Sequence, residues 1–596
     1  MPRARQQVLS PVKPGAKRST PKAAIAKKCF LPDWLEDGRA WGITVQLYEL
    51  RSLRNWGIGD FVDLAAFCVI AARAGADFVG TNPLHALFLA DPARCSPFSP
   101  SSRLFLNPLY IAVDKVPGYT EEIAEPHAIH HLADSPLVNY EGVAETKLKA
   151  LRKLWQLRRK HARRKAIASD GFEAFRESGG EQLRLHALFE ALSLHMVEEG
   201  RGAGWTDWPK EFHDPAGEAV AEFARRHENE IAFHSWLQWL AYEQLDAAKA
   251  AARAAGMRIG LYLDLAVGEA PDGSARWSDR DLFVPGVSVG APPDFFTANG
   301  QDWGLAPLSP DALARHRGAP YRRMLDALMR HAGALRIDHA MSLWQIFLVP
   351  EGGVPAEGAY VSYPAEALLA ALADASAEHG AIVIGEDLGN VPEGFRDMME
   401  KALILSYRIL YFEQKDGGFI LPKDYPRLAI ACLSTHDLPT LKGWWRGDDI
   451  RLRQEHGLID AEAAATQAAE RAALRNALIR TLLASRALKV QELMPVREAS
   501  PTSRSAVPSS LVVAAHRFMA KTPCLLMGIR LADLAGESRP TNLPGTTDSY
   551  PNWRPKCPVP LEELARYPLF RAITGAVAAE RPKKASSGGA DASENA

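Results

Sequence analysis

The segment ALRIDHAM, Ala334–Met341, holds the pattern on which both the fold and the site depend. It begins as a short apolar run and then presents three polar residues, Arg336, Asp338 and His339. An unpaired charge in a protein interior is costly, so charged side chains at the end of a buried strand need either partners or a function. Arg336 and Asp338 are two positions apart, which places them on the same side of a strand.

Seven further runs share the character of this one. All are short, apolar and rich in β-branched residues, and most are separated by Ala-rich stretches with helical spacing. Alternating strands and helices predict parallel βα units, and eight strands favour a closed α/β barrel, a (β/α)8 barrel of TIM type, over an open sheet. The other seven runs are GITVQLYEL from residue 42, DFVGTNPL from 77, MRIGLYLDLAV from 257, AIVIGEDLG from 381, SYRILYFE from 406, RLAIACLSTHD from 427 and CLLMGIRLADL from 524.

The spacing of these runs predicts how the chain is organised. Residues 29–114 begin the barrel, and residues 115–245, too many for one crossover helix, predict a mostly helical inserted subdomain. The rest of the barrel covers 246–575, with a helical excursion near 455–495, and residues 1–28 and 576–596 are expected to be disordered tails. Within the insertion, the basic stretch Lys147–Lys165 has an apolar stripe, which favours a docked helix over a nucleic-acid or membrane-surface helix.

Composition narrows the class of protein. The 596 residues carry a net charge of -1, so no strong field favours nucleic acid or a membrane surface as a partner. The six cysteines include no C-x-x-C pair, which disfavours a disulfide framework and fits a reducing compartment. No apolar run reaches the ~18 to 20 residues that span a bilayer. We therefore expect a cytoplasmic protein, and the sequence carries no indication of its oligomeric state.

Three of the predicted strands end in carboxylates: Asp338 in RIDH, Glu386 in IGEDLG and Asp437 in STHDLP. The carboxyl ends of barrel strands meet on one face, so these groups should converge. Glycosidic-bond chemistry needs such a set. One carboxylate attacks or shields the sugar carbon, a second protonates the leaving oxygen, and a third can hold the sugar.

The neighbouring residues suggest roles for these groups. Arg336 would keep Asp338 ionised, and burial after an apolar run would raise the pKa of Glu386, as a general acid requires. His436, beside Asp437, could hydrogen-bond a sugar hydroxyl. Each of these features could instead be structural: a carboxylate that caps a helix, an ion pair or a packing contact. Because carboxylates occur at the ends of three different strands, a catalytic site is favoured over these structural roles. A metal or phosphate site is disfavoured because the corresponding motifs are absent.

Longer motifs extend this interpretation. They are, in order, QLYELRS, NWGIGDF, GADFVGTNPLHALF, SPFSPSSRLFLNPLYI, GGEQLRLHALFEALS, LQWLAYEQL, GAPPDFFTANGQDWGLAPL, ALRIDHAM, VIGEDLGNVPEGFR, LSTHDLPTLKGWW and NLPGTTDSYPNWR. As a set, from about residue 40 to 570, they resemble the amylomaltases, or 4-α-glucanotransferases (disproportionating enzymes), of glycoside hydrolase family 77. This family is akin to the α-amylase clan.

The resemblance implies a TIM-type barrel without a separate C-terminal β-domain. It also implies retaining transfer of an α-1,4-glucan segment to the 4-hydroxyl of an acceptor glucose or glucan, with no cofactor or metal. Glucans and maltooligosaccharides would be the substrates. By motif, Asp338 resembles the nucleophile, Glu386 the acid/base and Asp437 the stabiliser of the transition state.

The same resemblance implies a set of substrate-binding residues. Those around the cleaved sugar are Arg336, His339 and His436, those on the acceptor side are Asp294 and Trp303, and Asn552 is expected to face the same groove. One departure from the family pattern is Phe98 in SPFSPSSR, where a Tyr is expected. The missing hydroxyl removes one possible hydrogen bond to the glucan, worth ~1 kcal/mol.

Two other functions compete with glucan transfer. An α-glucan hydrolase would share the three carboxylates and differ in the loops that capture the acceptor. A catalytically silent glucan-binding protein is disfavoured, because all three carboxylates are present. The ratio of transfer to hydrolysis, the preferred donor length, the formation of cyclic glucans, the role of the basic tail and the pathway served stay open at this stage.

Overall fold

The structure is a computed structural model that describes residues 27–164, 171–293, 299–492 and 507–583. Its centre is a parallel eight-stranded sheet in which the strands follow one another in chain order. A bridge between Ile384, in the fifth strand along the chain, and Leu405, directly before the sixth, closes the barrel. The strands are β1 (Gly42–Val45), β2 (Phe78–Thr81), β5 (Gly260–Leu265), β8 (Ala334–Ile337), β11 (Ile382–Gly385), β12 (Ser406–Ile409), β15 (Ala429–Cys432) and β16 (Leu526–Arg530).

All eight predicted strands are therefore confirmed, as is the barrel. The sequence runs are apolar on both sides because a parallel strand in a barrel is covered by helices outside and by packed side chains inside. Strand β11, for example, is buried along its whole length.

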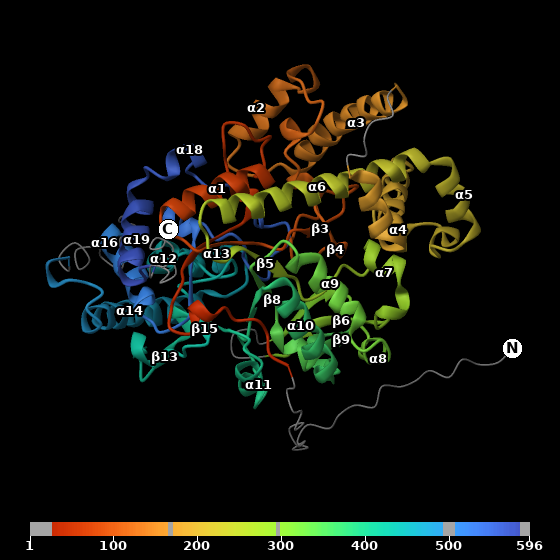
Figure 1. Cartoon of the computed structure of the whole chain (residues 1–596). Helices are drawn as coiled ribbons and strands as arrows, with labels where there is room; N and C mark the ends of the chain where they lie inside the picture. Colours follow the sequence, from red (N-terminus) through yellow and green to blue (C-terminus); the bar gives the residue numbers. More distant parts are fainter. Residues whose placement is uncertain (1–26, 165–170, 294–298, 493–506, 584–596) are drawn as a thin grey trace, which may run out of the picture.

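Helices form the outer layer of the barrel (Figure 1). Helix α1 begins after Asp60, whose side chain accepts hydrogen bonds from Val62 N and Asp63 N. Helix α10 ends at Gly380, which has the left-handed backbone (φ 62°) that glycine adopts at low cost. The helices that follow barrel strands are α1 (Phe61–Arg73), α6 (Glu228–Ala254), α8 (Pro310–Arg315), α9 (Ala319–Met329), α10 (Ala365–His379), α11 (Phe395–Lys401), α16 (Ser509–Ala520), α17 (Leu531–Leu534), α18 (Leu561–Leu564) and α19 (Pro568–Glu580).

Two groups of helices interrupt the βα alternation. Helices α2 (Pro126–Asp134), α3 (Tyr140–Arg164), α4 (Phe172–Glu198) and α5 (Glu218–Arg226) lie in the segment predicted to be inserted and helical, and α4 packs on α6. Helices α12 (Leu441–Arg446), α13 (Asp448–Glu455) and α14 (Ala461–Ala484) lie between β15 and α16. Figure 1 shows these two groups on different sides of the barrel.

The basic helix α3 is docked by its apolar stripe, with Leu151 and Trp155 buried. One lysine differs from the expected solvated face. Lys147 is buried, and its Nζ donates to the carbonyl oxygens of Leu109 and Ile111 at 2.7 and 2.9 Å. These two hydrogen bonds satisfy a buried ammonium group and fix α3 to the chain that follows β4 (Ser102–Leu106).

The sequence did not predict a four-stranded antiparallel sheet that lies outside the barrel. Its order is β10–β9–β6–β7, with β6 at Val287–Ala291, β7 at Gln301–Leu305, β9 at Gln345–Pro350 and β10 at Ala359–Ser362. Strands β7 and β10 are largely exposed, so they lack the apolar run that marks a barrel strand. Two short pairs, β3 (His85–Ala86) with β4 and β13 (Gln414–Lys415) with β14 (Gly418–Phe419), were also not predicted. The short helix α7 (Ser274–Ser278) follows β5.

The predicted tails need one correction. Helix α19 continues to Glu580, and Arg581 is 2% exposed, so the ordered chain extends past residue 576. The Arg581 guanidinium donates to the carbonyl oxygens of Ala40, Ala520 and Cys524. This contact holds the end of α19 against the chain that enters β1. Of the predicted N-terminal tail, only Lys27 and Lys28 lie within the described residues.

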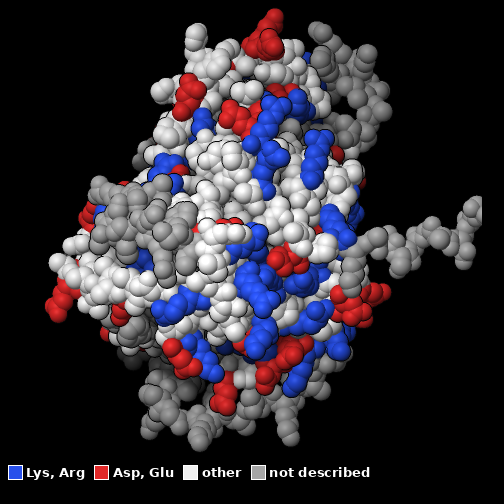
Figure 2. Space-filling model, turned by 90° about the vertical axis from the view of Figure 1, so that its left-hand side faces the viewer, with Lys and Arg blue, Asp and Glu red and all other residues white. Residues whose placement is uncertain are grey.

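The face drawn in Figure 2 carries Lys and Arg side chains with Asp and Glu side chains among them. Within the described ranges, no helix is both long and apolar enough to cross a membrane.

Candidate active site

Strands β5 and β8 bring two carboxylates to one arginine. Asp264 and Arg336 are register partners in the sheet, so their side chains leave neighbouring strands at the same level. The Arg336 Nη1 atom lies 2.8 and 2.9 Å from the two carboxylate oxygens of Asp264, and its Nη2 atom lies 2.8 Å from Asp338 Oδ1. The pKa of Arg336 is raised well above its ordinary value, because these carboxylates outweigh the effect of burial. Asp338 therefore faces a permanent positive charge.

Glu386 follows β11 and is held by two backbone N–H groups. Its Oε1 accepts from Leu388 N at 2.7 Å, and its Oε2 accepts from His339 N at 3.1 Å. His339 has a left-handed backbone (φ 46°), which aims its N–H at the carboxyl group. Burial raises the pKa of Glu386 to about 7, with a smaller contribution from the charge of Asp338. The raised pKa expected from the sequence is therefore confirmed.

Asp437 lies in the loop after β15 and is fixed by two side chains. Its Oδ2 lies 3.0 Å from His436 Nε2, and its Oδ1 accepts from Asn542 Nδ2 at 2.7 Å. Desolvation alone would raise the pKa of Asp437, but His436, Asn542 and Arg336 together hold it at about 2. With 45% of its side chain exposed, Asp437 is an ionised carboxylate open to the solvent above the barrel.

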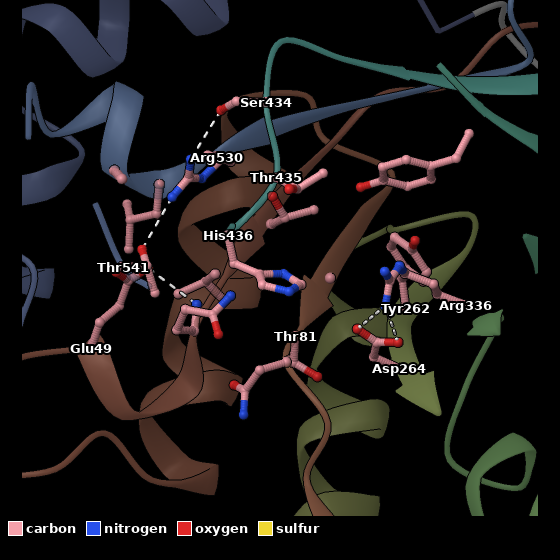
Figure 3. Close-up of a pocket in the computed structure, with 18 residues that line it drawn as sticks. Glu49, Thr81, Tyr262, Asp264, Arg336, Ser434, Thr435, His436, Arg530 and Thr541 are labelled. Atoms are coloured by element: carbon pink, nitrogen blue, oxygen red, sulfur yellow. Dashed lines mark hydrogen bonds and ion pairs between the residues drawn. The ribbon is translucent and has the colours of Figure 1, made fainter. Parts of the chain in front are cut away.

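Asp264, Arg336 and His436 line an open pocket of about 610 Å³ at the carboxyl ends of the strands (Figure 3). Asp338 and Asp437 adjoin it through their ion pairs with Arg336 and His436. Asp264 and Arg336 lie together in one wall, and His436 enters from the other side. Buried hydroxyls with no partner in the described structure, on Thr81 and Tyr262, add polar atoms to the wall. The structure thus brings the pocket and the three predicted carboxylates to one face of the barrel.

Aromatic rings support the two histidines. Phe98 stacks on His436 with ring centroids 4.5 Å apart, and Trp553 lies 5.5 Å from both rings. Trp303, on β7, contacts His339 edge to face at 5.2 Å. Burial lowers the pKa of His339 to about 4, so this imidazole is neutral near pH 7. Although Phe98 lacks the expected hydroxyl, its ring packs directly against the site through His436.

Of the predicted substrate-binding residues, Arg336 and His436 line this pocket, whereas His339, Trp303 and Asn552 do not. The Asn552 amide is buried in its own loop, where Oδ1 accepts from Leu543 N and Nδ2 donates to Thr546 O. The expectation that Asn552 faces the groove is corrected, because the loop uses its hydrogen-bonding groups. Asp294 lies outside the described residues.

Asp264 and Asn542 are the site residues that the sequence reading missed. Asp264 stands inside the apolar run LYLDLAV, two residues from the buried Tyr262, and this placement of a carboxylate inside a strand was the available signal. Asn542 stands in an irregular loop, and nothing local in the sequence indicates its contact with Asp437.

We expect Asp264→Asn to lower kcat by about 10- to 100-fold, because a charge-assisted hydrogen bond to the arginine is worth ~1.5 to 3 kcal/mol. Arg336 would lose the partner that holds it against Asp338. The matched control is Asp77→Asn, since Asp77 is equally buried and pairs with Arg258 at 2.7 Å at the start of β2. Both variants should lose stability in thermal unfolding, but only Asp264→Asn should lose turnover. Equal turnover in the two variants would contradict a role for Asp264 in the site.

A closed parallel barrel whose strand ends gather three carboxylates and an arginine has the arrangement of barrel enzymes that act on glycosidic bonds. The family model described as 4-alpha-glucanotransferase, of glycoside hydrolase family 77, matches residues 45–561. The chain is 37% identical to the 4-alpha-glucanotransferase of Haemophilus influenzae, over 90% of this chain and 78% of that protein. It is also 37% identical to the 4-alpha-glucanotransferase of Mycobacterium bovis, over 88% of this chain and 72% of that protein. The chain therefore belongs to the 4-alpha-glucanotransferase family, and the predicted enzyme class is confirmed.

Solved structures agree with this assignment. The amylomaltase of Corynebacterium glutamicum matches with a TM-score of 0.79 and 31% identity, over 91% of this chain and 76% of that one. The amylomaltase of Streptococcus agalactiae in complex with acarbose matches in fold with a TM-score of 0.71 at 19% identity, over 90% of this chain and 99% of that one.

Proposed function

We propose that the enzyme transfers α-1,4-glucan segments by a retaining double displacement through a covalent glucosyl-enzyme. The observation that carries the proposal is the environment of the two central carboxylates. Asp338 is ion-paired to Arg336, while burial raises the pKa of Glu386 to about 7. One carboxylate is thus suited to attack and the other to donate a proton, which is the division of labour in a retaining enzyme.

In the first step, Asp338 attacks the anomeric carbon of the donor as Glu386 protonates the departing 4-oxygen. The C–O bond of the glycosidic linkage breaks, a β-linked glucosyl ester forms on Asp338, and the shortened glucan leaves as an alcohol. The carboxylate of Asp437, held ionised by His436 and Asn542, stabilises the positive charge that develops on the sugar. Retaining enzymes of this kind hold their two catalytic carboxyl groups about 5 to 5.5 Å apart.

In the second step, Glu386 is a carboxylate and takes the proton of the incoming 4-hydroxyl. That oxygen attacks the ester carbon, the bond to Asp338 breaks, and an α-1,4 linkage is restored. Water is present at ~55 M, so the acceptor sugar must be held in place to compete with it. Trp303, on the antiparallel sheet outside the barrel and in contact with His339, is suited to cover the apolar face of an acceptor ring.

The first test is incubation of the purified enzyme with maltotriose alone, followed by separation of the products by chain length. We expect a ladder of longer oligomers together with glucose, because one maltotriose serves as donor and another as acceptor. Glucose and maltose without longer species would mean that water is the acceptor. Unchanged maltotriose, with activity restored on longer maltooligosaccharides, would set a minimum donor length, whereas no reaction with any α-glucan would contradict the proposal.

A further inference from the structure

A second hollow lies outside the catalytic pocket, between the barrel and the inserted helices. It measures about 460 Å³, is lined from β4, α4, α7 and α9, and shares no lining residue with the catalytic pocket. Figure 1 shows α4, α7 and α9 on the same side of the barrel. Helix α7 packs against α4 and β4, and β4 packs against α9, so the walls belong to one packed unit.

An aromatic ring forms one wall of the hollow. Phe105 is half-buried near the end of β4, and its ring stacks on His186 of α4 with centroids 4.2 Å apart and planes at 8°. Nothing fits between rings at this spacing, so the accessible part of Phe105 is its other face or its edge. His186 is 2% exposed and is itself fixed by Ser274 Oγ, 2.8 Å from its Nδ1. The phenyl ring is thus a supported apolar surface.

Polar side chains surround this ring. Gln182, Asp279 and Arg323 line the hollow and are exposed. In the part of the chain that the structure describes, none of these three side chains has a hydrogen bond or an ion pair. Ser278 also lines the hollow, and its hydroxyl donates to Ser274 O at 2.7 Å, which leaves its oxygen available as an acceptor.

The charges of the lining balance. Asp279 and Arg323 have opposite signs, and the buried Glu269, which also lines the hollow, is paired with Arg103 at 3.4 Å. A lining with no net charge selects neither an anion nor a cation. An apolar ring beside amide, carboxylate, guanidinium and hydroxyl groups suits a neutral ligand with one apolar face and many hydroxyls, which is the chemistry of a sugar ring.

We propose that this hollow is a second carbohydrate-binding site, which holds glucosyl units of a long α-glucan away from the catalytic carboxylates. The choice of an α-glucan as the ligand rests on the proposed function. A chain tethered here has a raised effective concentration at the catalytic pocket, and only a glucan long enough to reach both sites gains from it. Maltotriose is too short to gain.

The test compares Phe105→Ala and Arg323→Ala on amylose and on maltotriose. Each variant removes one side chain that lines the hollow, Phe105→Ala an aromatic ring and Arg323→Ala a hydrogen-bond donor. In both, kcat/KM on amylose is expected to fall by about five- to tenfold, and kcat/KM on maltotriose to stay within about twofold of that of the unaltered enzyme. Arg480→Ala is the matched control, since Arg480 is an exposed arginine of α14, a helix that Figure 1 shows on the opposite side of the barrel from α4 and α7. Equal losses on the two substrates, an unchanged rate on amylose, or the same loss in Arg480→Ala would each overturn the proposal.

A binding measurement separates this proposal from the proposed function. Calorimetric titration of the full-length Asp338→Asn chain with maltohexaose is expected to fit two sites, and Asp338→Asn with Phe105→Ala to fit one. Because the nucleophile is absent, this readout does not depend on transfer activity. A single site in both chains would overturn the second site, whatever the result with maltotriose.

Discussion

Asp338→Asn is expected to lower kcat for glucan transfer on the order of 10⁴-fold or more, the scale seen when a covalent nucleophile is removed. Asparagine has nearly the same shape, so the side chain can still accept a hydrogen bond from Arg336. The amide oxygen is a poor nucleophile, and the glucosyl ester does not form. The measurement is the initial rate of maltotriose disproportionation at saturating substrate.

Stability should change much less than activity in this variant. Arg336 keeps both hydrogen bonds to Asp264 when Asp338 is replaced, so the guanidinium remains paired. Thermal unfolding should therefore show a fold as cooperative as that of the unaltered chain. An Asp338→Asn enzyme that still transfers glucan at a comparable rate would overturn the assignment of the nucleophile.

The barrel was predictable because its strands carry a local signal. Buried parallel strands must be apolar on both faces, so runs such as AIVIG and ALRI stand out against their helical neighbours. The sheet that carries Trp303 has no such signal. In β7 only Leu305 is buried, and a strand of this kind is recognised only through its partners β6 and β9.

The site was predictable to the extent that it lies at strand ends. Asp338 and Glu386 follow apolar runs directly, and the barrel rule places them on one face. Arg336 has two carboxylate partners, of which the sequence predicted only Asp338. The contact with Asp264 depends on the register between β5 and β8, and the sequence of one strand alone does not contain that register. Asn552 shows the reverse case. A polar residue in a recognisable motif can serve its own loop instead of a substrate.

Glu386→Gln is expected to lower kcat on maltotriose by about 10²- to 10⁴-fold, the usual range for loss of a general acid. Glutamine keeps the shape, and its single amide oxygen can accept from one of the N–H groups of His339 and Leu388, but it has no acidic proton to give. The loss should depend on the leaving group. With α-glucosyl fluoride as donor, whose fluoride departs without protonation, formation of the glucosyl-enzyme should largely recover in Glu386→Gln and stay absent in Asp338→Asn.

The pH profile gives the sharper form of this prediction. Burial raises the pKa of Glu386 to about 7, so the free enzyme holds the required proton below that value and loses it as the pH rises through it. In the unaltered enzyme kcat/KM should therefore fall on the alkaline side of about pH 7, and in Glu386→Gln this limb should vanish. Asp387→Asn is the neighbouring control. Asp387 is 0% exposed and accepts from Ser406 Oγ and Tyr407 N, so its loss should lower stability and leave the limb in place. If the limb persisted in Glu386→Gln, another group would be the acid, because glutamine does not titrate.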